Sequence, residues 1–89
     1  MINVTPLAAD KLKGILDEEG QPDGALRVIV VANEHGAQYM MALEEEAKSD
    51  DTVIHENGVK VLVDSASVPL LEGAEIDYID SLMRSGFVI

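Results

Sequence analysis

From residue 25 onward, the apolar residues follow the pattern of β-strands, and short polar turns separate them. The run LRVIVVAN, within Ala25 to Asn33, is dense in β-branched residues, which is typical of a strand largely buried on both faces. A second strand, QYMMALEEE, is expected at residues 38–46. The residues between the two runs, 33–37, predict a hairpin turn. This part of the chain is therefore expected to be mainly β.

Further strands are expected towards the end of the chain. Two short ones should flank Asn57-Gly58, because Asn-Gly is the strongest short-range hairpin signal. The segment from Asp64 to Leu71 predicts a capped helical turn, since its Asp and Ser side chains supply hydrogen-bond acceptors. Residues 74–80 alternate apolar with acidic side chains, which indicates a strand with one face in water. A last strand is expected from Gly86 to Ile89.

The N-terminal segment has the pattern of an amphipathic helix. Thr5-Pro6 is read as N-cap and first helical position, Gly20 should end the helix, and one apolar stripe lies between them, formed by Ala8, Leu12, Ile15 and Leu16. The prediction is a single α+β domain over residues 1–89, mainly β, in which short strands are capped by this helix. Leu71 and Ile76 are the expected core anchors.

Composition limits both the core and the chemistry. Aromatic residues make up 3% of the chain, so the core must be aliphatic. The chain contains no cysteine, which excludes disulfides, thiolate nucleophiles and cysteine-ligated metal sites within it. Because the sequence shows neither a signal-peptide pattern nor a long uncharged apolar run, a cytoplasmic protein without a membrane span is expected.

The charge balance limits the partners. Six Lys and Arg stand against 17 Asp and Glu, for a net charge of −11, and such a chain repels nucleic-acid phosphates and anionic membranes. The same charge favours a basic protein surface or cations as partners. Neither a phosphate-binding glycine loop nor a Ser-His-Asp arrangement is found, and carboxylates such as Asp77 and Asp80 read as a solvated face. No catalytic residue is predicted, and the chain is not expected to be an enzyme.

Two histidine–glutamate pairs are the candidate metal ligands. Glu34-His35 lies in the first predicted turn and His55-Glu56 beside the second, and together they offer enough ligands for zinc or iron if the two hairpins meet in space. The alternative is that these are ordinary exposed turn residues, since neighbouring side chains point in different directions. The candidate metal residues are Glu34 and His35.

The whole chain resembles the A-type iron–sulfur carriers, the HesB/IscA-like family. The resemblance is strongest from Gly58 to Ile89, where GVKVLVDSASVPLLEGAEIDYIDSLMRSGFVI carries V-D-x-x-S, L-x-G, I-D-Y and G-F. VTPLAADKLKGIL and ALRVIVVAN add to it. The resemblance implies a β-rich pseudobarrel or β-sandwich with a capping N-terminal helix, assembling as dimers or tetramers.

The resemblance also implies which residues would hold iron or a cluster. The family uses one cysteine in a G-C-S-G turn of the first hairpin and two in a C-terminal C-G-C-G. Here the turn reads Asn33-Glu34-His35-Gly36, and the sequence stops at Ile89, before that tail. If Gly36 matches the glycine of the family turn, Glu34 takes the place of the cysteine; with a gap elsewhere, His35 does.

Two functions follow as hypotheses. The first is a non-catalytic accessory or interaction protein of iron–sulfur cluster biogenesis that binds no cluster itself and contacts a protein partner, either an assembly component or a second copy in a homo-oligomer. The second is a thiol-free mononuclear metal-binding protein that uses Glu34 and His35. No cofactor is predicted for the first, and iron or zinc is the ion expected for the second.

Overall fold

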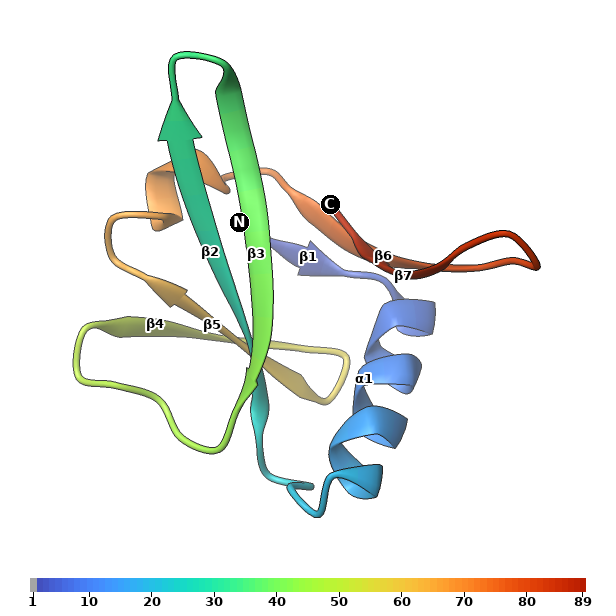
Figure 1. Cartoon of the computed structure of the whole chain (residues 1–89). Helices are drawn as coiled ribbons and strands as arrows, with labels where there is room; N and C mark the ends of the chain where they lie inside the picture. Colours follow the sequence, from blue (N-terminus) through green and yellow to red (C-terminus); the bar gives the residue numbers. More distant parts are fainter. Residues whose placement is uncertain (1) are drawn as a thin grey trace.

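Seven strands, one α-helix and one 3₁₀-helix make up the part of the chain that the computed structural model describes, residues 2–89 (Figure 1). In chain order the elements are β1 (Asn3–Val4), α1 (Pro6–Glu18), β2 (Ala25–Asn33), β3 (Gly36–Glu44), β4 (Asp51–Glu56), β5 (Val59–Asp64), η1 (Val68–Leu70), β6 (Glu75–Asp80) and β7 (Ser85–Val88). The predicted class, α+β and mainly β, is confirmed.

The strands form two sheets, both of which mix parallel and antiparallel pairs. The larger sheet has the order β3-β2-β5-β4, and in it β2 and β5 run parallel. The smaller has the order β1-β6-β7, with β1 and β6 parallel. Helix α1 lies beside both sheets (Figure 1). Within residues 2–89 the strands therefore form two separate sheets and not a closed barrel.

Helix α1 begins and ends as the sequence predicts. The Thr5 hydroxyl accepts a hydrogen bond from the Ala8 N–H at 3.1 Å, Pro6 opens the helix, and Gly20 follows its end with a φ of +73°. The same hydroxyl donates to Asp77 Oδ1 at 2.8 Å and ties the helix start to β6. This bond lowers the pKa of Asp77. No described helix is both long and apolar enough to cross a membrane.

The core is aliphatic and lies where α1 meets the two sheets. Leu71 and Ile76 have exposed fractions of 2% and 1%, which confirms both as core anchors. They belong to one buried cluster, whose other members are Ile2, Val4, Ala8, Ala9, Leu12, Leu16, Leu26, Val28, Val59, Val61 and Val63. Tyr78 and Phe87 pack against this cluster. Their two rings contact each other edge to face, with centroids 5.0 Å apart.

Strand β2 is buried only in its first half, so the prediction of burial on both faces is wrong for the second. Residues 25–28 are buried, whereas the strand is exposed from Val31 onward. The cause is the register, because β5 pairs with residues 26–28 and β2 then continues with β3 alone. The outer half of β2–β3 projects from the body as a free hairpin (Figure 1).

The predicted capped turn at 64–71 is shorter and differently bonded. The helical residues are Val68–Leu70, and the Ser67 side chain does not cap them. Its hydroxyl donates to Asp64 Oδ1 at 2.7 Å and accepts from the Val30 N–H at 3.2 Å. Ser67 is 2% exposed, so a residue read as a helix cap instead fastens this segment to β2.

Candidate functional site

The candidate site is the tip of the β2–β3 hairpin. The two strands pair continuously from Ala25 opposite Glu44 to Asn33 opposite Gly36, so Glu34 and His35 form the two-residue loop. The His35 N–H donates to the Asn33 side-chain oxygen at 2.8 Å, and Gly36 takes the positive φ, +117°, that the return of the chain requires. The position of the tip is thus fixed by the backbone and by an Asn side chain.

Both candidate ligands are exposed and lie close together. The Glu34 and His35 side chains have exposed fractions of 88% and 86%, and Glu34 Oε1 lies 3.6 Å from His35 Nε2. The expectation that the two side chains point apart is therefore wrong. Two adjacent donors from one chain still fall short of the three or four protein ligands that zinc sites use.

The second histidine–glutamate pair lies elsewhere in the fold. His55 is in β4, and its hairpin with β5 turns near α1, while the β2–β3 tip projects away from the body (Figure 1). Within residues 2–89, no group of three or more His, Asp or Glu side chains is arranged to hold a metal ion. The two hairpins do not meet, so the four-ligand arrangement that would need them together is wrong.

A buried ion pair beside the hairpin was not indicated by the sequence. Arg27 in β2 and Asp51 in β4 make two hydrogen bonds of 2.7 Å, and their side chains are 8% and 1% exposed. Glu44 Oε1 lies 3.3 Å from Arg27 Nε, and the Lys48 N–H donates to Asp51 Oδ2 at 2.6 Å. The pair therefore holds the β3–β4 loop against the sheet below the hairpin.

Hydrogen bonding shifts the titration of both partners. The two bonds from Arg27, followed by the one from the Lys48 N–H, lower the pKa of Asp51 to about 2. The hydrogen bonds to Asp51 raise the pKa of Arg27. Both side chains are thus charged over the physiological pH range. Arg27 and Asp51 are held by their contacts with each other and with the Lys48 N–H, which suits a structural role rather than acid–base chemistry.

Comparison with known proteins identifies the family of this chain. The sequence matches the family described as iron-sulphur cluster biosynthesis over residues 1–89. The chain belongs to this family. The HesB/IscA-like resemblance is thereby confirmed.

Relatives and solved structures agree with this assignment. Proteins named for iron–sulfur cluster insertion, ErpA of Burkholderia cenocepacia and of Burkholderia multivorans, are 51% identical over 86 residues, which cover 96% of this chain and 70% of theirs. A crystal structure of IscA with a [2Fe-2S] cluster matches with a TM-score of 0.81 and 30% identity, covering 98% of this chain and 81% of that one. SufA of Escherichia coli, at 24% identity and a TM-score of 0.84, covers 98% and 76% and supports the fold alone.

The donor set of this chain does not fit an iron–sulfur cluster. Clusters are held by soft thiolate ligands, and the 89 residues contain no cysteine. At the hairpin tip the side chains available are a carboxylate and an imidazole.

Proposed function

We propose that this chain is a non-catalytic accessory protein of iron–sulfur cluster biogenesis that contacts protein partners and binds no cluster itself. The observation that carries the proposal is the β2–β3 tip, where Glu34 and His35 stand in a turn that presents a thiolate in the carriers. The family fold is kept over nearly the whole chain while this ligand is not. What the chain shares with the carriers is its family and fold.

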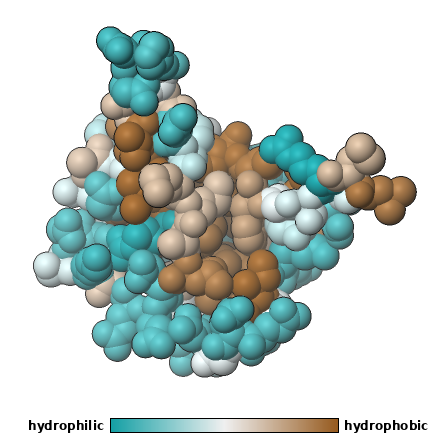
Figure 2. Space-filling model, viewed as in Figure 1, coloured by the Kyte–Doolittle hydropathy of each residue, from teal (hydrophilic) through white to brown (hydrophobic). Residues whose placement is uncertain are grey.

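Exposed apolar side chains support a role in binding another protein. Leu82 and Met83, at the tip of the β6–β7 hairpin, have exposed fractions of 106% and 94%, and Met40 in β3 is 59% exposed. Ser81 orders the tip of the β6–β7 hairpin, because its N–H and its hydroxyl both donate to the Arg84 carbonyl, at 2.9 and 2.8 Å. Figure 2 shows apolar surface at the end of this projecting arm. Ordered, solvent-exposed Leu and Met side chains are typical of contact surfaces.

Anaerobic reconstitution with iron and sulfide tests the proposal. We expect no stoichiometric cluster absorbance on this chain, because a carboxylate and an imidazole hold a cluster poorly. ErpA of Burkholderia cenocepacia, treated in parallel, is the positive control. Stoichiometric cluster absorbance on the 89-residue chain, retained through gel filtration, would contradict the proposal.

A second function, mononuclear metal binding, is favoured by the 3.6 Å approach of Glu34 Oε1 to His35 Nε2. These two metal ligands lie exposed on a projecting loop, where ligands from a second chain would complete the metal site. On this hypothesis, titration with Zn²⁺ or Fe²⁺ shows binding that His35→Ala abolishes and His55→Ala leaves unchanged. Equal binding by wild type and His35→Ala would remove His35 from the site.

A further inference from the structure

The outer edge of strand β3 is free to pair with another strand. β3 lies at one edge of the larger sheet, and among the described strands it pairs with β2 alone. It runs for nine residues, Gly36–Glu44, along the hairpin that projects from the body (Figure 1). Beyond the ladder with β2, residues 37–43 make no hydrogen bond to any other residue in the range 2–89.

The hydrogen-bonding pattern shows which backbone groups of β3 face outwards. Residues opposite each other in an antiparallel ladder alternate between pairs that exchange hydrogen bonds and pairs that do not. Val30 lies opposite Tyr39, but its N–H donates to the Ser67 hydroxyl at 3.2 Å, so this pair is not hydrogen-bonded. The N–H and C=O groups of Tyr39 therefore point away from β2. By the same alternation, the other outward-facing residues are Ala37, Met41 and Leu43.

Strand β3 is unprotected against pairing over residues 36–43. Edge strands are commonly kept apart by charged side chains, proline, bulges or short length. The stretch GAQYMMAL contains neither charge nor proline, and its register with β2 is continuous. Tyr39 and Met40 are 47% and 59% exposed, and as neighbours they lie on opposite faces of the strand. A strand added at this edge would therefore contact a large side chain on each face.

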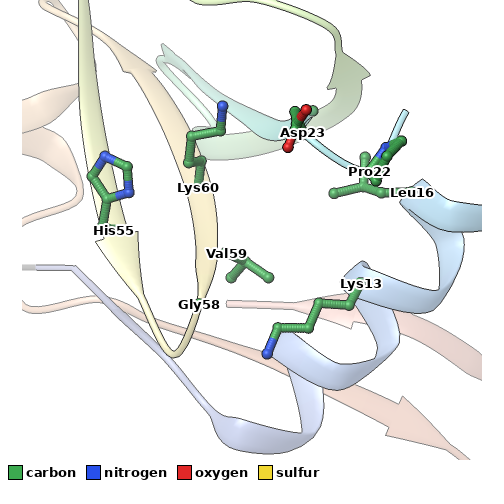
Figure 3. Close-up of a pocket in the computed structure, with 9 residues that line it drawn as sticks. Lys13, Leu16, Pro22, Asp23, His55, Gly58, Val59 and Lys60 are labelled. Atoms are coloured by element: carbon green, nitrogen blue, oxygen red, sulfur yellow. The ribbon is translucent and has the colours of Figure 1, made fainter. Parts of the chain in front are cut away.

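The other sheet edges are shorter, and the longest of them is charged. β1 and β7, at the edges of the smaller sheet, have two and four residues. β4, at the other edge of the larger sheet, has six, which include Asp51, His55 and Glu56. Figure 3 shows the His55 side chain on β4. Among the described strands, β3 therefore offers the longest uncharged edge.

Charge indicates which kind of strand fits this edge. Acidic side chains lie beyond both ends of the uncharged stretch, with Glu34 at the tip and the exposed Glu45 and Glu46 after β3. A second copy paired antiparallel about Met40 would bring Glu34 of each chain towards Glu46 of the other. Like charges placed opposite each other destabilise strand pairing, and two chains of net charge −11 repel each other. Basic residues at the ends of an incoming strand would meet opposite charge.

We propose that β3 binds an extended segment of a protein partner that is apolar at its centre and carries Lys or Arg at its ends. The segment adds a strand to the larger sheet and exchanges backbone hydrogen bonds with the outward-facing residues of β3. Its side chains pack beside Tyr39 on one face and beside Met40 on the other. This inference rests on the contact with protein partners proposed above, and it names the surface and the chemistry of that contact.

Titration of the full chain with a synthetic peptide tests the proposal. The probe alternates valine and threonine at its centre and has a pair of lysines at each end. We expect saturable binding, with new protection from hydrogen exchange at the outward-facing amides of β3. The alternate amides, such as that of Met40, are expected to be protected in the free chain already, because they bond to β2. Absence of saturable binding, or protection elsewhere than on β3, would overturn the proposal.

Two altered peptides separate strand pairing from general attraction. N-methylation throughout the centre removes the hydrogen-bond donors of the peptide and should weaken binding about tenfold or more. Exchange of the lysines for glutamates keeps the backbone intact and should weaken binding by a similar factor. Equal affinity for all three peptides would contradict both the pairing and the charge preference.

Proline variants locate the edge that binds. Tyr39→Pro removes an outward-facing N–H of β3 and keeps the bonds to β2, so peptide affinity should fall about tenfold or more. Val53→Pro is the matched control on β4, because its N–H also faces outwards by the alternation counted from the Asn57-Gly58 turn. Its affinity should change about twofold or less. Equal affinity of the two variants would overturn the proposal, and the altered peptides decide it on wild type if Tyr39→Pro does not fold.

Sedimentation of the free chain tests the alternative that a second copy occupies the edge. We expect the same sedimentation for wild type and Tyr39→Pro. A wild-type assembly that Tyr39→Pro dissociates would overturn the proposal. Cluster reconstitution and peptide binding are measured separately, so failure of the function proposed above is distinguishable from failure of this inference.

Discussion

Ile76→Ala is expected to lower the free energy of unfolding by about 2–5 kcal/mol, the usual cost of truncating a fully buried aliphatic side chain. Ile76 is 1% exposed and lies in the core cluster. Its backbone pairs with Val4 in β1, and its carbonyl accepts the Thr5 N–H at 2.9 Å, immediately before α1. A cavity at this position would loosen the contact of the helix with the smaller sheet.

Urea and thermal unfolding measure this effect. In a domain of this size the loss corresponds to a fall in melting temperature of roughly 10 °C or more. Ile79→Ala is the matched control, because Ile79 lies in the same strand but is only half-buried and does not belong to the core cluster. It should lose clearly less stability. An unchanged melting temperature for Ile76→Ala would show that the strand assignment there is wrong.

Local patterns in the sequence were sufficient to predict most elements of this fold. Thr5-Pro6 and Gly20 bound the helix because capping depends on neighbouring residues. The Asn57-Gly58 turn was found for the same reason, and both residues have positive φ in the structure. Strand β1 was missed, because its two residues become a strand only by pairing with Glu75 and Ile76, over 70 positions away.

The candidate site was predictable to a lesser extent. The hairpin tip and its two polar residues followed from turn chemistry, but the 3.6 Å approach of their side chains did not. The sequence around Arg27 did not indicate that this side chain is buried. Its partner Asp51 lies 24 residues away, in a polar segment that is typical of an exposed turn.

The stability that Asp51 contributes is expected to disappear in acid. Its folded-state pKa is about 2, against an ordinary value of 3.8. Because folding lowers this pKa, the folded state favours the ionised carboxylate. The contribution is therefore complete above pH 3.8 and is lost as the pH falls towards 2. Asp51→Asn should be less stable than wild type at neutral pH, since it leaves the buried guanidinium without its charged partner.

The difference in urea unfolding midpoint between wild type and Asp51→Asn reports on the Asp51 carboxylate alone, because the other acidic residues titrate in both proteins. Urea unfolding midpoints, measured from about pH 5 down to about pH 2, should therefore converge as the wild-type Asp51 becomes protonated. Asp50→Asn is the matched control, because the Asp50 side chain is next to Asp51 in sequence but exposed, and it makes no such pair. This variant should stay close to wild type in stability at neutral pH. A difference in unfolding midpoint between wild type and Asp51→Asn that stays constant over this pH range would mean that the charge on Asp51 contributes nothing to stability. The bond to Arg27 would then act through shape and neutral hydrogen bonding, which an asparagine at this position preserves in part.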